Sequence, residues 1–266
     1  MPESIDRSEG RRLFGLDPES YHGVRPDYPD WIFTALVEAQ VLYPGAATLE
    51  IGAGSGLATR HLLRAGVDPL VLVEPDERFA GVLNGLIGSA DADCRLVSAS
   101  FEDAVLDAAS FDLVVAATSF HWLDPASGLV RIRALLKRDG GVALMWNVFH
   151  QPGREDPFHE ATHALLHGLA TSPSGSTEGL PFPLDRAARE ADARSAGFRH
   201  VTYRESRWTI ELDGERTVRL YESFSNIARL PPERRAEVLG ELRRIADTDF
   251  GGRVERPVTS CLYVLR

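Results

Sequence analysis

The chain has 266 residues, of which 44% are hydrophobic and 26% charged, as in an ordinary soluble globular protein. Its formal net charge of -10 argues against sequence-independent binding to nucleic acid, because an acidic surface repels phosphate backbones. No apolar stretch reaches the roughly 20 residues that cross a bilayer, and the polar N-terminus lacks the apolar core of a signal peptide. Cys94 and Cys261 are the only cysteines, which favours a reducing compartment. A cytoplasmic protein is expected, with neither nucleic acid nor membrane as a partner.

The first half of the chain alternates short apolar segments with amphipathic ones. Five segments are β-branched and apolar nearly throughout, which is typical of strands covered on both faces: residues 47–51, 69–74, 94–99, 111–117 and 141–147. Helices are expected between them at 57–65, 76–87 and 126–137, and a turn is expected at 138–141. This alternation predicts a mostly parallel sheet with helices on both faces.

The alternation ends after Asn147. The remaining pattern predicts helices and two strands, the helices at 158–170, 186–196, 217–230 and 233–250 and the strands at 198–212 and 258–266. No linker separates independent domains, so residues 1–266 are predicted to form a single domain.

A glycine-rich turn, EIGAGSG at residues 50–56, follows the first predicted strand and opens the first helix. Glycines allow positive φ angles and let a ligand touch the main chain, and the start of a helix offers free N–H groups. A dinucleotide-binding fingerprint needs G-x-G-x-x-G, which would place its third glycine at Leu57. Here the third glycine is Gly56, and an acid precedes the first, so this pattern does not fit that class.

The pattern E-x-G-x-G-x-G resembles the first motif of class I S-adenosylmethionine-dependent methyltransferases. In that family an acid at the end of the second strand holds the ribose hydroxyls, and Glu74 stands at that place. A carboxylate can accept both protons of a vicinal diol. The resemblance implies a Rossmann-like α/β fold with a seven-stranded sheet of order 3-2-1-4-5-7-6, whose last strand is antiparallel.

Three further segments resemble the type-11 methyltransferase group, in particular its trans-aconitate methyltransferase-like branch: YHGVRPDYP at 21–29, residues 98–125 and the closing strand within 251–266. Carried over residue by residue, the resemblance implies a cofactor site formed by Tyr21, Arg25, Glu50, Gly52, Ala53, Gly54, Gly56, Glu74, Pro75, Ser100, Phe101, Glu102, Thr118 and Ser119. Arg25 is a candidate partner for the methionine carboxylate. Residues 1–45 are expected to form an N-terminal lid and helix, and residues 148–197 and 213–250 helical insertions that cap the substrate.

His121 follows the fourth predicted strand, at the sheet edge where ligands bind in such folds. With an unperturbed pKa near 6.5 it is a candidate catalytic base. The alternative is that His121 and Trp122 form a structural pair that closes the pocket. Tyr21, Phe120 and Trp146 are candidates to steady the positive sulfur, with core packing as the alternative. A carboxylate acceptor would need no base, since it is ionised at neutral pH.

Three histidines, His159, His163 and His167, share one face of a predicted helix. Glu160 lies off that face, so a polar helix face is expected there and no metal site. The sequence therefore predicts a methyltransferase that uses S-adenosyl-L-methionine to methylate an O, N or C atom of a small molecule, a metabolite carboxylate or natural-product intermediate, as a monomer or homodimer. Two alternatives stay open: a cofactor-binding protein of this fold with a non-methylating reaction, and a dinucleotide oxidoreductase.

Overall fold

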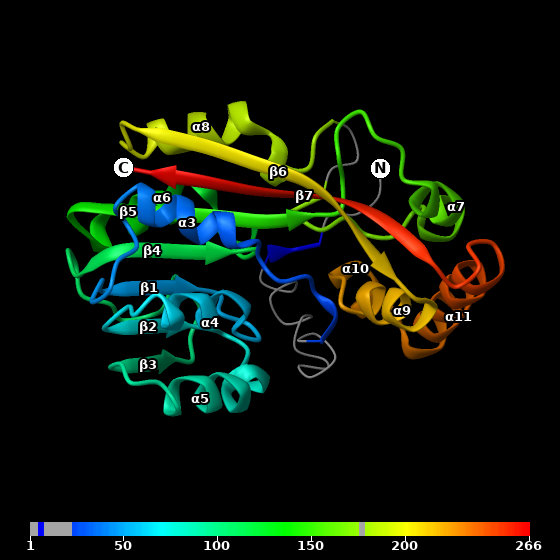
Figure 1. The fold of residues 1–266 in the computed structure, drawn as a ribbon, viewed down its shortest axis with the longest axis horizontal. Coiled ribbons are helices and arrows are strands. Elements are labelled where there is room, and N and C mark those ends of the chain that lie inside the picture. The colour runs from blue at the N-terminus through cyan, green and yellow to red at the C-terminus, as the bar shows by residue number, and fades with distance from the viewer. Residues whose placement is uncertain (1–4, 8–22, 176–178) are drawn as a thin grey trace.

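A seven-stranded sheet forms the centre of the computed structural model, which describes residues 5–7, 23–175 and 179–266 (Figure 1). Its strand order is β3-β2-β1-β4-β5-β7-β6. The strands are β1 (Thr48–Ile51), β2 (Leu70–Val73), β3 (Cys94–Val97), β4 (Phe111–Ala117), β5 (Leu136–Val148), β6 (Val201–Leu212) and β7 (Val254–Leu265). The first five strands pair in parallel, and β7 is antiparallel to both of its neighbours. The predicted fold and strand order are confirmed.

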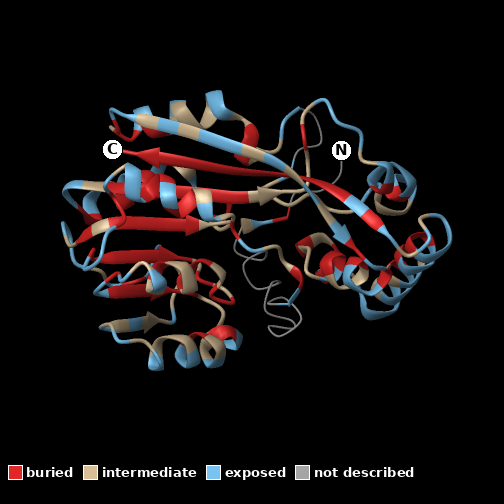
Figure 2. Ribbon diagram, viewed as in Figure 1, coloured by how far each residue is buried: buried red, intermediate tan, exposed pale blue. Residues whose placement is uncertain are grey.

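Helices cover both faces of the sheet. One face carries α3 (Asp30–Glu38), α4 (Leu57–Arg64) and α5 (Ala80–Gly88), and the other carries α6 (Pro125–Leu135) and α8 (Arg186–Ser195). Side chains alternate between the two faces along each strand: Leu70 and Leu72 face the first layer, and Val71 and Val73 the second. Strands β1 and β2 are consequently buried throughout, as Figure 2 shows for the centre of the sheet, whereas the edge strands β3 and β6 are partly exposed.

A helical cap lies beyond the carboxyl ends of the parallel strands (Figure 1). It consists of α7 (Pro157–Leu166), α9 (Gly214–Glu222), α10 (Ser225–Ala228) and α11 (Pro232–Thr248). It has an apolar cluster of its own, in which Phe158, Tyr221 and Leu242 are buried together. The predicted cap also included α8, but Ala193 and Ala196 at the end of that helix pack into the sheet core beside α6.

Several element boundaries differ from the sequence prediction, among them the following two. The helix expected to reach residue 137 ends at Leu135, and β5 begins directly at Leu136. Leu136 pairs with Phe111, and the next pair joins Gly141 to Leu113, so the expected turn is an irregularity within the strand. The helix expected at 217–230 is broken, because Phe224 has an extended ψ of 136° between α9 and α10.

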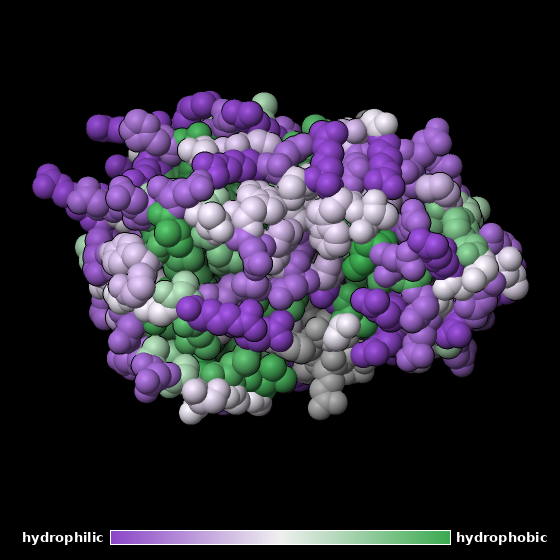
Figure 3. Space-filling view, in the orientation of Figure 1, coloured by the Kyte–Doolittle hydropathy of each residue, from purple (hydrophilic) through white to green (hydrophobic). Residues whose placement is uncertain are grey.

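The viewed face of the molecule is mostly hydrophilic, with apolar side chains in small separate patches (Figure 3). Among the described residues, no helix is both long and apolar enough to span a bilayer. A cavity lies at the edge of the sheet, where the parallel strands end.

Candidate cofactor-binding site

The cavity opens at the carboxyl ends of β1, β2, β4 and β5, where ligands bind in doubly wound folds because the strand order reverses there. Its empty space, counted out to the solvent at its mouth, is about 1040 Å³. Its walls come from the segment before α3, from the strand ends and from the loops that follow them. The lining residues include Arg25, Pro26, Tyr28, Glu50, Gly52, Ala53, Gly54, Ser55, Glu74, Pro75, Phe79, Phe101, Thr118, Ser119, Trp122, Leu123, Asn147 and Phe149.

The glycine-rich turn after β1 forms one wall, and its three glycines all have positive φ. A Cβ on Gly52 would lie 2.6 Å from Cβ of Ser119, and one on Gly56 would lie 2.3 Å from Cδ1 of Leu86. A side chain at Gly52 is therefore excluded by packing as well as by its φ. At Gly56 the close atom is the end of a flexible side chain, so it is the positive φ that favours glycine. A Cβ on Gly54 would meet nothing within 4 Å, although its φ is 52°. Gly54 is thus the glycine at which bare main chain faces open space.

Glu74 lies beside this turn, at the end of β2, and is only 7% exposed. Its Oε2 accepts a hydrogen bond from the Gly54 N–H at 2.8 Å, and its Oε1 accepts one from the Asp76 N–H at 2.9 Å. Burial raises the pKa of Glu74 to about 7, although these two backbone donors oppose the shift. The carboxylate is therefore fixed against the turn and lines the cavity.

Glu50 lies deeper, on β1, and is 1% exposed. The Thr59 hydroxyl donates to its Oε2 at 2.7 Å. Burial raises the pKa of Glu50 to about 8, and the nearby Glu74 adds to the increase. Two buried carboxyls therefore face one cavity, and at neutral pH Glu50 holds its proton.

The stability of the ligand-free protein is expected to fall as pH rises from about 4.5 to about 8. The unfolded chain releases the Glu50 proton near its ordinary value of 4.5, whereas the folded protein retains it up to about 8. The contribution of Glu50 to the free energy of unfolding is therefore complete below pH 4.5. It falls by up to about 1.4 kcal/mol per pH unit as pH rises toward the folded pKa. Urea unfolding of Glu50→Gln, an isosteric neutral variant, should show a flatter decline than the wild type, and exposed Glu222→Gln should not. Equal slopes in all three proteins would contradict the prediction.

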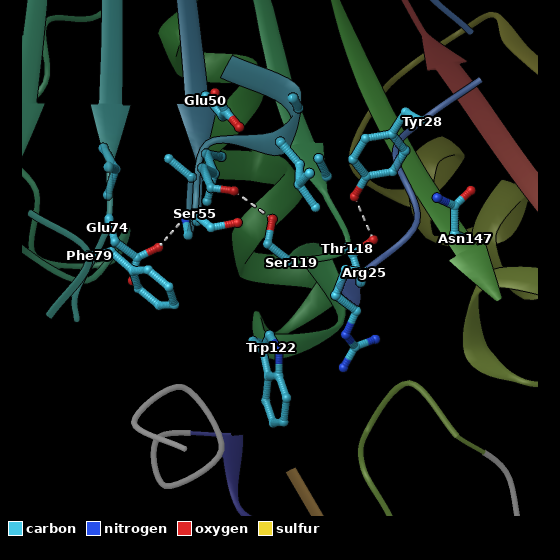
Figure 4. A pocket seen from close by; sticks show the side chains of 18 of the residues that line it. Arg25, Tyr28, Glu50, Ser55, Glu74, Phe79, Thr118, Ser119, Trp122 and Asn147 are labelled. Atoms are coloured by element: carbon cyan, nitrogen blue, oxygen red, sulfur yellow. Dashed lines mark hydrogen bonds between the residues drawn. The ribbon is translucent and has the colours of Figure 1, made fainter. Parts of the chain in front are cut away.

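The opposite wall comes from the segment before α3 and from the ends of β4 and β5. The Tyr28 hydroxyl lies 2.7 Å from Oγ1 of Thr118. Asn147 donates from Nδ2 to the carbonyl oxygens of Pro26 at 3.0 Å and Asp27 at 3.2 Å. Figure 4 shows Glu74 and Phe79 on one side of the cavity, Tyr28 and Arg25 on the other, and Trp122 between them. Carboxylate, bare main chain and aromatic rings thus surround one space.

Comparison with known proteins gives the family. Residues 49–144 match a protein family described as a methyltransferase domain. A relative from Schizosaccharomyces pombe, named as an uncharacterized methyltransferase, is 29% identical over 239 residues, covering 89% of this chain and 88% of that protein. The match, the relative and the strand order identify a class I S-adenosylmethionine-dependent methyltransferase domain at residues 49–144. The match favours a methyltransferase over the dinucleotide oxidoreductase that the sequence left open, and the trans-aconitate branch stays a prediction.

Solved structures share the fold of this methyltransferase at low sequence identity. The phosphoethanolamine N-methyltransferase 2 of Haemonchus contortus, in complex with phosphomonomethylethanolamine and S-adenosylhomocysteine, superposes with a TM-score of 0.56 at 14% identity. The match covers 95% of this chain and 57% of that one. The [4+2]-cyclase SpnF superposes with a TM-score of 0.58 at 13% identity over 100% of this chain and 97% of that one. These likenesses concern the fold alone.

The structure brings most of the predicted cofactor residues of the methyltransferase to one cavity. The residues that line it are Arg25, Glu50, Gly52, Ala53, Gly54, Glu74, Pro75, Phe101, Thr118 and Ser119. Gly56 packs beneath the turn, Ser100 donates to Asp103, and Glu102 is exposed, so these three do not line the cavity. Tyr21 lies outside the described residues. Phe120 and Trp146 are buried in the sheet core. Core packing was the alternative given for them to contact with the positive sulfur.

His121 does not line the cavity and is only 2% exposed. Its Nδ1 accepts a hydrogen bond from Nε1 of Trp146 at 3.2 Å. Burial lowers the pKa of His121 to about 3, and the positive charges of Arg25 and Arg7 add to the decrease. The ring is therefore neutral at physiological pH, with its acceptor nitrogen engaged. A catalytic role for His121 stays a prediction, and this geometry argues against it.

The sequence did not single out several lining residues: Tyr28, Phe79, Asn147 and Phe149. Tyr28 stood within the segment whose Tyr21 and Arg25 were selected, and Asn147 ends β5 as Thr118 follows β4. Position at a strand end was thus the available signal. For the aromatic rings no local signal separates a cavity wall from ordinary core packing.

The histidine face of α7 lies away from this cavity. His159 and His163 have ring centroids 6.3 Å apart, and those of His163 and His167 are 5.4 Å apart. In the part of the chain that the structure describes, no group of three or more His, Cys, Asp or Glu side chains is arranged to hold a metal ion.

Proposed function

We propose that this methyltransferase methylates a small molecule that lies between the glycine-rich turn and the helical cap. The observation that carries the proposal is the single cavity with Glu74 and Gly54 on one side and Arg25, Tyr28 and Trp122 on the other. The cavity is lined mostly by apolar and aromatic side chains with a few polar groups among them, as is usual for small-molecule sites. One side of it suits a nucleoside, and the other side leaves room for an acceptor.

The groups that line the cavity fit S-adenosylmethionine. The Glu74 carboxylate can accept the protons of a ribose diol, and the open space at Gly54 admits a ligand against the main chain. Pro75, Phe79 and Phe101 give an apolar wall for the adenine. Thr118 and Ser119 lie toward the methionine end. When bound, S-adenosylmethionine supplies a methyl group that is already activated, so the protein has to align the acceptor and exclude water.

We infer that the acceptor atom reaches the cavity already nucleophilic, as a carboxylate or another anionic oxygen. Among the described lining residues, the titratable carboxyls are Glu50 and Glu74, and both are engaged by hydrogen bonds on the cofactor side. His121 has its acceptor nitrogen engaged by Trp146. Arg25 gives the far side a positive charge that favours an anionic acceptor.

The test has two parts. Isothermal titration with S-adenosylmethionine and S-adenosylhomocysteine is expected to show binding to one site. Mass spectrometry of candidate acids and phenols incubated with enzyme and cofactor is expected to show the gain of one CH₂ unit. Cofactor binding with consumption of an acceptor but no gain of CH₂ would favour the non-methylating alternative. Failure of both ligands to bind would refute the proposal.

A further inference from the structure

Residues 23–29 form a segment, here named the strap, that crosses one wall of the cavity before α3 begins at Asp30. The strap is fastened to the strand ends of the sheet. Tyr28 contacts Thr118 after β4, and Asn147 at the end of β5 donates to two strap carbonyls. Asn147 is itself held, because the Ser260 hydroxyl on β7 donates to its Oδ1 at 2.6 Å. The strap is therefore fixed to the sheet, on the side of the cavity opposite Glu74.

Arg25 joins this strap to the helical cap. Its Nε donates to Oγ of Ser223 and its Nη2 donates to the main-chain oxygen of Ser223, both at 2.9 Å. Its guanidinium also lies 4.6 Å from the ring centroid of Phe224. The Phe224 ring in turn meets Phe149, a cavity-lining residue, edge-on at 5.8 Å. One turn of the cap is thus held between two residues of the cavity wall.

The geometry at Ser223 suits an arginine specifically. Ser223 is the C-cap of α9, where the last carbonyl groups of a helix lack partners within the helix. A cation at this end is favoured by the helix dipole, and the planar guanidinium donates two parallel bonds where an ammonium group cannot. The break between α9 and α10 lies at this contact, since Phe224 turns to an extended conformation directly after it.

We propose that Arg25 is a positioning residue that fixes the cap against the strap through Ser223 and so forms the acceptor side of the cavity. This differs from the role for which the sequence made it a candidate, as a partner of the methionine carboxylate. The assignment of that side to an acceptor rests on the proposed function, whereas the contact between strap and cap does not.

A double-mutant cycle tests the proposal. Arg25→Lys keeps the charge but loses the two-point contact, Ser223→Ala loses the hydroxyl acceptor, and Ser223→Thr keeps it as the matched control. Hydrogen exchange of residues 214–230 is measured in the ligand-free protein and with S-adenosylhomocysteine, and exchange of β1 and β4 reports on the global fold. The affinity for S-adenosylhomocysteine is measured by titration.

Arg25→Lys and Ser223→Ala are each expected to speed exchange of residues 214–230 by about tenfold, as for the loss of a charge-assisted hydrogen bond. The two effects should combine less than additively in the double variant, because Nε of Arg25 and Oγ of Ser223 share one hydrogen bond. They should not coincide, because Nη2 of Arg25 still donates to the main-chain oxygen in Ser223→Ala and the Ser223 hydroxyl also donates to the Leu220 main-chain oxygen. Ser223→Thr should match the wild type, and β1 and β4 should be unchanged. Any effect on cofactor affinity should be the same in both single variants. Additive effects, unchanged exchange, or an affinity loss of more than tenfold in Arg25→Lys alone would overturn the proposal.

If Arg25→Lys does not fold, the comparison of Ser223→Ala with Ser223→Thr decides. A wild type without affinity for S-adenosylhomocysteine would refute the proposed function, and exchange in the ligand-free protein would still test the contact.

Discussion

Replacing Glu74 with alanine is expected to weaken the binding of S-adenosylmethionine by about 100-fold, because charge-assisted hydrogen bonds to a diol contribute about 3 kcal/mol together. The variant also frees the Gly54 and Asp76 N–H groups, which now donate to the two carboxylate oxygens. Glu74 is buried and its carboxyl is costly to ionise, so its removal should not unfold the protein. Titration calorimetry with S-adenosylmethionine measures the loss, and thermal unfolding checks the fold.

Two variants control the Glu74 experiment. Glu102→Ala removes an exposed acid that the sequence also assigned to the cofactor but that does not line the cavity, so its affinity should stay within threefold of the wild type. Glu74→Gln keeps the volume and loses the charge. Because the ionised carboxyl is the better acceptor and its pKa is about 7, wild-type affinity should rise between pH 6 and pH 8 through this group, and that contribution should be absent in Glu74→Gln. A Glu74→Ala variant with unchanged affinity would refute the assignment of the ribose site.

The fold could be predicted from sequence where local pattern and tertiary structure agree. Strands β1, β2 and β4 are short, apolar on both faces and separated by amphipathic helices, so their order follows once the family resemblance is accepted. The start of β5 could not be predicted, because KRDGG reads locally as a turn. Gly140 lies there because a Cβ would approach the Phe111 main-chain oxygen to 2.9 Å, a contact with a distant strand that the sequence does not reveal.

The same distinction divides the candidate site. Gly54 and Glu74 were predictable because each lies at a strand end, within a motif read along the chain. The opposite wall depends on contacts between segments far apart, such as Tyr28 with Thr118 and Asn147 with the strap. His121 illustrates the limit most clearly. Its position after β4 suggested chemistry, but the donor that occupies it, Trp146, comes from another strand.

Replacing Gly54 with alanine is expected to weaken cofactor binding by roughly 10- to 100-fold, the range that overpacking of one carbon by 1–3 kcal/mol produces. In the ligand-free protein the new Cβ meets no atom within 4 Å, so it occupies space that the bound cofactor would need. The residue also keeps a φ of 52°, which costs alanine about 1–2 kcal/mol whether or not a ligand binds. Strain and ligand exclusion therefore have to be separated.

Gly45 offers a matched control for Gly54. It also has a positive φ, of 81°, and a Cβ there would likewise meet nothing within 4 Å, but it lies on a surface loop and does not line the cavity. Gly45→Ala and Gly54→Ala should thus lose similar stability in denaturant unfolding, while only Gly54→Ala loses affinity for S-adenosylmethionine in titration. If both variants bind the cofactor equally well, the main chain at Gly54 does not touch it. If both variants lose affinity for S-adenosylmethionine, the loss comes from backbone strain. The glycines of the turn would then serve packing alone and not contact with the cofactor.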